Sequence, residues 1–112
     1  MPESFERGAL TEAVFYILLS LHEPMHGYAV MQNIERLSDG RVALGPGTLY
    51  GAINVLVQKR WIAATGAGRD SRKKEYVVTA AGRAVFKGEL ARLRELLRNG
   101  EGLLEGEHDE AV

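Results

Sequence analysis

Residues 45–80 read GPGTLYGAINVLVQKRWIAATGAGRDSRKKEYVVTA, and this stretch decides the fold. Apolar residues recur at helical spacing after a proline that suits the first turn of a helix, which predicts a helix over residues 47–60. Residues 61–65 and 75–78 have the composition of two strands, and the basic, glycine-containing residues 66–74 between them are typical of a loop. The stretch therefore predicts a helix followed by a β-hairpin with a long basic tip.

Two further helices are expected before this stretch. The second of them covers residues 26–37 and is followed by the turn signal Ser38-Asp39-Gly40. The first begins at Leu10 or Thr11 and stops before Pro24, because the residue preceding a proline avoids helical backbone angles. Its apolar stripe consists of Leu10, Val14, Ile17, Leu18 and Leu21. Residues 41–44 are expected to form a short extended piece ahead of the third helix.

A last helix is predicted over residues 80–98, with Thr79 as its N-cap. Phe86, Leu90, Leu93 and Leu97 are spaced by four, three and four residues, a seam typical of a helix that packs against another helix. At about 1.5 Å per residue this helix is roughly 28 Å long, too long for so small a domain to cover. Asn99-Gly100 is expected to end it.

Length and composition bound the rest of the organisation. The 112 residues suit one ordinary domain, and the order of elements predicts an α+β, mostly α, winged helix-turn-helix over residues 10–79. Residues 80–98 then form a dimerisation helix, residues 1–9 a flexible N-terminus and residues 99–112 an acidic, disordered tail. Because the chain has no cysteine, no visible signal peptide and no apolar run that could span a bilayer, we expect a cytoplasmic protein without membrane, metal or cofactor.

The net charge of −1 hides a strong asymmetry along the chain. Residues 41–98 contain twelve Lys and Arg against four Asp and Glu, a local balance of +8. The segment from Asn99 onward contains five acidic residues and no basic one. A basic region of this kind favours double-stranded DNA as the partner, although a solvated basic surface is the alternative interpretation.

Three motifs follow one another at characteristic offsets: HGY at residues 26–28, GPGTLY at 45–50 and KKEYVVTAAGR at 73–83. Together they resemble the signature of the PadR family of transcriptional regulators, and the resemblance extends over about residues 10–97. It implies the short, single-domain class of that family, with a winged helix-turn-helix and one C-terminal dimerisation helix. It also implies repression of detoxification, efflux or stress genes, and in many members a response to small, often aromatic molecules.

Carried over by position, the third helix reads DNA through Thr48, Tyr50 and Asn54. Asn54 has the chemistry to pair with adenine, Thr48 either contacts phosphate or caps the turn, and Tyr50 either reaches the DNA or packs against the wing. The hairpin loop adds four candidate contacts to the DNA backbone: Arg69, Arg72, Lys73 and Lys74. Gly51 departs from the family, many of whose members carry a basic residue there, so base readout is expected to be weaker or to depend more on Tyr50 and Asn54.

The predicted dimer interface joins the first and last helices through Leu10, Val14, Phe86, Leu90, Leu93 and Leu97. Three aromatic residues on the same helices, Phe15, Tyr16 and Phe86, either line a pocket for a small aromatic effector or simply pack in this interface. Tyr28 is interpreted as a core residue, with DNA contact as the alternative. Trp61, where many relatives have a glycine, is interpreted as packing beneath the sheet, with stacking on a flat ligand as the alternative.

One motif points to a different class of protein. His22-Glu23-Pro24-Met25-His26 matches the H-E-x-x-H pattern of zinc peptidases, which requires both histidines on one continuous helix. Pro24 breaks that helix, so we expect neither a metal site nor enzymatic activity. The prediction is a repressor that binds a pseudo-palindromic operator as a homodimer and is released by a small ligand; a winged-helix module that only contacts other proteins is the alternative.

Overall fold

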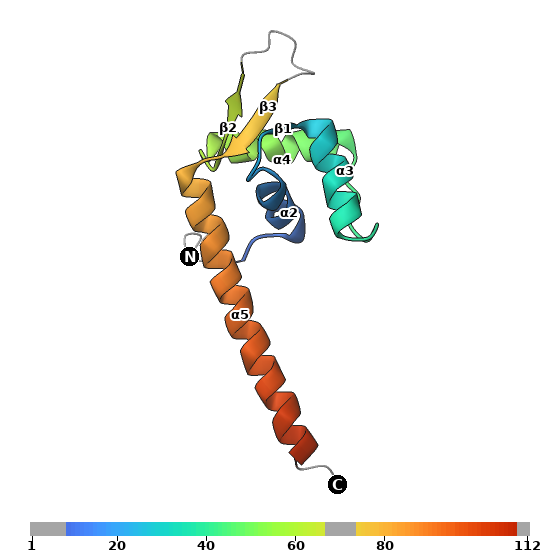
Figure 1. Cartoon of the computed structure of the whole chain (residues 1–112), viewed down its shortest axis with the longest axis vertical. Coiled ribbons are helices and arrows are strands. Elements are labelled where there is room, and N and C mark those ends of the chain that lie inside the picture. The colour runs from blue at the N-terminus through green and yellow to red at the C-terminus, as the bar shows by residue number, and fades with distance from the viewer. Residues whose placement is uncertain (1–8, 67–73, 110–112) are drawn as a thin grey trace.

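A computed structural model describes residues 9–66 and 74–109, and most of these residues are helical. The helices are α2 (Glu12–Ser20), α3 (Gly27–Leu37), α4 (Pro46–Gln58) and α5 (Ala80–Asp109), and the strands are β1 (Met25–His26), β2 (Ile62–Thr65) and β3 (Glu75–Val78). Figure 1 shows α2, α3 and α4 gathered beside the sheet, with α5 extending away from them. This arrangement is a winged helix-turn-helix with a long C-terminal helix, as the sequence predicted.

The sheet has three strands in the order β1-β3-β2, and both pairings are antiparallel. The hairpin of β2 and β3 was predicted, and Ile62 pairs with Val78 in its register. The third strand was misplaced by the sequence analysis: residues 41–44 form no strand, and Met25–His26 pairs with Tyr76 and Glu75 instead. The pairing of two residues just after Pro24 with a strand fifty residues away leaves no local sequence signal.

Helices α3 and α4 end in the same way, with a residue in the left-handed conformation. Asp39 (φ 58°) follows α3 and Arg60 (φ 65°) follows α4. In each case the N–H of that residue and the N–H of the next one donate back to carbonyls of the last turn, for example Gly40 to Glu35 at 2.8 Å and Trp61 to Leu56 at 3.1 Å. These bonds satisfy the free carbonyls at the helix ends and fix the direction in which the chain leaves them.

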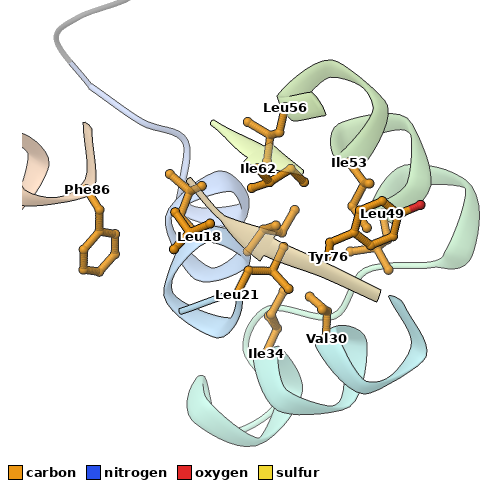
Figure 2. Packing of buried hydrophobic residues seen from close by; sticks show 12 residues of the cluster. Leu18, Leu21, Val30, Ile34, Leu49, Ile53, Leu56, Ile62, Tyr76 and Phe86 are labelled. Carbon is orange, nitrogen blue, oxygen red and sulfur yellow. The ribbon is translucent and has the colours of Figure 1, made fainter. Parts of the chain in front are cut away.

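The hydrophobic core lies between α2, α3, α4 and the sheet, and Figure 2 shows its side chains converging there. Helix α4 contributes Leu49, Ile53 and Leu56. Helix α3 contributes Val30 and Ile34, whereas Leu37 at its end is 41% exposed. The complete set of buried apolar residues is Ile17, Leu18, Leu21, Val30, Ile34, Leu49, Ile53, Leu56, Ile62, Tyr76, Val78 and Phe86.

Helix α5 does not end at Asn99-Gly100. It continues to Asp109, so most of the segment expected to be a disordered tail is helical. The prediction relied on the low helix propensity of Gly100. A low propensity at one residue does not end a helix when other interactions favour it. None of the described helices is both long enough and apolar enough to span a lipid bilayer.

Candidate nucleic-acid interface

The outward face of α4 carries the residues predicted to read DNA. Thr48 and Asn54 are exposed, whereas Leu49 and Ile53 point into the core and hold the helix against α3. An exposed helix face of this kind can enter the major groove of B-DNA, where an asparagine amide can pair with the edge of adenine. The structure therefore presents Thr48 and Asn54 on one accessible surface, with Gly51 leaving open space between them.

Tyr50 has a different environment from its two neighbours, because it packs on the start of α3. Its side chain is 37% exposed, and a Cβ atom built on Gly27 would lie 2.3 Å from the Tyr50 hydroxyl oxygen. Gly27 of the HGY motif therefore leaves room, by lacking a side chain, for the ring of Tyr50 from the GPGTLY motif. This contact brings the N-terminal turns of α3 and α4 together.

The interpretation of Tyr28 as a core residue was wrong. Its side chain is 59% exposed at the second position of α3, beside the contact between Gly27 and Tyr50. Its place in the HGY motif suggested packing, but Tyr28 does not lie on the buried side of α3, which Val30 and Ile34 form. An exposed tyrosine at this edge adds a candidate DNA contact that the sequence analysis undervalued.

The wing is described only in part. Lys74 is half-buried at the foot of β3, and the predicted contacts Arg69, Arg72 and Lys73 lie outside the described residues. At the other end of the hairpin, Trp61 is half-buried and packs against the core, as expected. The ammonium group of Lys59 lies 5.1 Å from the centre of the Trp61 ring, a cation–π contact at the end of α4.

Thr79 fastens the beginning of α5 to the corner between α4 and the wing. Its hydroxyl donates to the Arg60 carbonyl at 2.7 Å and accepts from the Gly82 N–H at 3.1 Å, while its own N–H donates to the Trp61 carbonyl at 2.9 Å. Gly82 is buried in the same place, and a Cβ atom there would lie 2.1 Å from the Trp61 carbonyl oxygen. The T-x-x-G motif thus fixes the direction of α5 relative to α4.

The residues suggested for an effector site are partly brought together. A pocket of about 310 Å³ between α2 and α5 is lined by Leu10, Glu12, Phe15, Tyr16, Glu89, Arg92 and Leu93. Phe86 is absent from this lining, because it is buried within its own chain and stacks on Phe15 with ring centroids 4.9 Å apart. Of the other residues predicted to form the dimer interface, Leu10, Val14 and Leu90 are half-buried, and Leu93 and Leu97 are exposed.

Glu89 is a buried carboxylate that the sequence analysis missed. Its two oxygens accept from the Arg92 guanidinium at 2.8 and 2.6 Å, and one also accepts from the Leu10 N–H at 3.3 Å. The hydrogen bonds from Arg92, aided by the one from Leu10, hold the pKa of Glu89 below its usual value despite its burial. The carboxylate, which also lines the pocket, therefore ties α5 to the residues just before α2.

Glu89→Gln is expected to remove an acid-dependent part of the stability. Because the folded-state pKa lies below the unfolded value of about 4.3, the ion pair stabilises the fold above that pH and is lost as the pH falls through the folded value. We expect the variant to be less stable at pH 7 by roughly 1–2 kcal/mol, with the gap closing below about pH 4. Urea unfolding at pH 7 and pH 3 measures this; the exposed Glu95→Gln variant is the control, and a gap of equal size at both pH values would contradict the assignment.

The zinc-peptidase pattern is not assembled in the fold. His22 lies in the turn after α2, where its Nδ1 is 2.8 Å from the Leu18 carbonyl oxygen, and His26 precedes α3 at the end of β1. The two histidines therefore do not share a helix. Within residues 9–66 and 74–109 no three His, Cys, Asp or Glu side chains gather closely enough to hold a metal ion.

An exposed helix that is held by a second helix, flanked by a β-hairpin and joined to a long C-terminal helix, defines a winged helix-turn-helix DNA-binding protein. The family model described as the transcriptional regulator PadR-like family matches residues 15–88. The chain therefore belongs to the PadR-like family of transcriptional regulators, as its motifs had indicated.

Solved structures agree with this assignment. A transcriptional regulator from Clostridium thermocellum is 25% identical with a TM-score of 0.66, and the match covers 80% of this chain and 86% of the other. A PadR family transcriptional regulator from Eggerthella lenta is 28% identical with the same TM-score, over 82% and 80% of the two chains.

A relative found by sequence is a 37.1 kDa protein of a Streptomyces fradiae transposon. It is 35% identical over 79 residues, which are 70% of this chain but only 22% of that relative.

Proposed function

We propose that this protein binds a pseudo-palindromic operator as a homodimer and represses transcription by occupying a promoter. The observation that carries the proposal is the outward face of α4, which presents Thr48 and Asn54 to solvent while its opposite face is locked into the core. Family membership supports the same conclusion. In a symmetric dimer two such helices would enter major grooves about 34 Å apart on one side of the duplex.

The proposal assigns different work to different residues. Asn54 supplies base readout, and Thr48, near the N-terminus of α4, supplies a hydroxyl for a phosphate oxygen. Tyr50 and Tyr28 border the same edge, where the first turns of α3 and α4 meet. The excess of basic residues between positions 41 and 98 supplies attraction that does not depend on the DNA sequence, so affinity should fall steeply with salt.

The pocket between α2 and α5 supports regulation by a small molecule. Phe15 and Tyr16 offer aromatic walls for a flat ligand, while the Arg92 guanidinium in the lining is already paired with Glu89. A ligand wedged between these two helices would change the direction of α5 and with it the spacing of the two DNA-binding units. Release then follows if the ligand binds more tightly to the spacing that does not fit the operator.

The test is fluorescence anisotropy with the duplex upstream of the protein's own gene and a scrambled duplex, over a salt series. We expect at least tenfold tighter binding to the native duplex, with a steep salt dependence for both. Asn54→Ala should lower affinity for the native duplex by about tenfold without changing the salt slope, since a lost base contact costs about 1–3 kcal/mol. Glu95→Gln, an exposed change on α5 away from this face, is the control.

Two outcomes would contradict the proposal in different ways. Equal, weak binding to both duplexes would show a protein that binds DNA without reading this sequence. No binding to either duplex at low salt would favour the winged-helix module that contacts only other proteins.

A further inference from the structure

A second cavity lies between the start of α2 and the second half of α4. Its volume is about 320 Å³, and among the described residues only Leu10 lines both this cavity and the pocket beside α5. Val14, Leu56 and Trp61 give it apolar walls. Sites for small molecules have volumes of roughly 300–1,000 Å³, mostly apolar walls and a few placed polar groups. The cavity has the size and the walls of such a site.

The walls of this cavity leave apolar surface in contact with water. Val55 is 48% exposed although it is the neighbour of Leu56, which is 2% exposed and belongs to the core. Val14 and Trp61 are half-buried. A flat apolar ring seated here would cover all three side chains, and removing their apolar surface from water favours binding. The indole of Trp61 favours an aromatic ring in particular, because aromatic pairs gain energy beyond the area that they bury.

The polar side chains in the lining are hydrogen-bond donors. The ammonium group of Lys59 lies 5.1 Å from the centre of the Trp61 ring, and this cation–π contact places it beside the apolar walls. The hydroxyl oxygen of Thr11 already accepts from the Val14 N–H at 3.1 Å, so its hydrogen is what it can offer to a ligand. Because lysine has donors only, the two groups together suit a ligand that carries an anionic acceptor.

The charges distinguish this cavity from the pocket beside α5. In that pocket Glu89 is bonded to Arg92, and Glu12 is bonded to Arg41. In this cavity Lys59 is the one charged residue among the described lining residues, and no carboxylate from residues 9–66 or 74–109 pairs with it. A carboxylate ligand therefore finds an available positive charge here, next to apolar walls that exclude part of the screening water.

We infer that this cavity binds a small aromatic carboxylate, with the ring against Val55 and Trp61 and the carboxylate on the Lys59 ammonium group. The inference goes beyond the proposed function, which places its effector between α2 and α5. Val55 directly follows Asn54, so the ligand would sit on the helix that is proposed to read DNA. The ring would also touch Trp61, which reports on its presence.

Fluorescence of Trp61 tests the site, because it is the single tryptophan of the chain. The probe is 4-nitrobenzoate, a quencher of indole fluorescence, and its neutral counterpart is 4-nitrobenzamide. We expect 4-nitrobenzoate to quench Trp61 with a saturable curve, and calorimetry to give an affinity about tenfold higher than for the amide, since hydrogen bonds between ions are stronger than neutral ones. Free N-acetyltryptophanamide corrects for quenching by collision.

Variants at Lys59 test the contact to the carboxylate. Lys59→Met keeps the length of the side chain and should lower the affinity for 4-nitrobenzoate by about tenfold, while the affinity for 4-nitrobenzamide stays the same. Lys59→Arg keeps the charge and should retain the preference for the acid over the amide. Lys87→Met, an exposed change on α5, is the matched control and should leave both affinities unchanged.

Three results would overturn the inference. The first is equal affinity for the acid and the amide, or the absence of saturable quenching. The second is a loss of 4-nitrobenzoate binding in Tyr16→Leu, which would assign the probe to the pocket beside α5. The third is weaker self-association of Lys59→Met in sedimentation experiments, which would show that a second copy of the chain covers the cavity.

The outcomes also separate this inference from the proposed function. A protein that binds the native duplex but shows no preference for the acid overturns the ligand site and leaves the DNA-binding function standing. A protein that binds 4-nitrobenzoate through Lys59 but binds no duplex supports the site and overturns the proposed function.

Discussion

Gly82→Ala is expected to lower the free energy of unfolding by roughly 2 kcal/mol or more, although alanine is the better helix former. The added methyl group would lie 2.1 Å from the Trp61 carbonyl oxygen and 2.6 Å from a methyl carbon of Val78. The first obstacle is backbone held by the hydrogen bond from the Thr79 N–H, so it cannot swing aside as a flexible side chain would. The helix must shift instead, and the bonds of Thr79 are lost with it.

Gly88→Ala is the matched control on the same helix. Gly88 is exposed, and a Cβ atom there would meet nothing within 4 Å, so this change should stabilise the protein by about 0.5–1 kcal/mol. Thermal unfolding followed by circular dichroism, at equal protein concentrations, compares the two variants with the parent. Equal stability of the Gly82→Ala variant and the parent would show that α5 is not fixed at this point.

A loss of this size at Gly82 would have a consequence for DNA binding. Thr79 and Gly82 join α5, the helix proposed to dimerise, to the corner after α4, at Arg60 and Trp61. In a dimer joined through α5, any rotation of α5 at this corner changes the distance between the two recognition helices. In such a dimer the contacts of Thr79 and Gly82 would therefore set the spacing of the two α4 helices.

The sequence predicted the elements whose signals are local. Helix α4 has apolar residues at helical spacing after Pro46, and the hairpin has two apolar strands around a polar loop, so their bounds fall within a few residues of those observed. Features that depend on distant contacts were missed. The pairing of Met25 with Tyr76 and the bond of Glu89 to the Leu10 N–H join residues far apart in the chain, and no periodicity announces either of them.

At the end of α5 a local signal gave a wrong prediction. Asn99-Gly100 has the composition of a helix end, yet the helix passes through it. Leu96 and Leu97 before Gly100 and Leu103 and Leu104 after it continue one helical spacing, which is a sequence signal for a longer helix. At the candidate site, Thr48 and Asn54 are exposed as predicted, and the position of Tyr50 depended on a contact with α3 that spacing alone does not give.

Gly27→Ala is expected to destabilise the protein by about 1 kcal/mol through displacement of the partly exposed Tyr50 ring, so the cost should depend on Tyr50. The new methyl group would lie 2.3 Å from the Tyr50 hydroxyl oxygen and 2.5 Å from the ring carbon that carries it. The ring must leave the start of α3, because Gly27 is buried and its backbone begins that helix. Urea unfolding of the single variants Gly27→Ala and Tyr50→Ala and of the double variant measures the coupling between the two positions.

In the Tyr50→Ala background the obstacle is gone, so Gly27→Ala should cost little, and the coupling free energy should be about 1 kcal/mol. Gly51→Ala is the control: it lies next to Tyr50, faces open space and should not destabilise. The same variants examined against the native duplex show what the contact does for function. If Tyr50 holds the first turns of α3 and α4 in the arrangement that DNA requires, Gly27→Ala should weaken binding about as much as Tyr50→Ala does. Additive costs in stability would mean that the two motifs fold independently and that their contact is incidental.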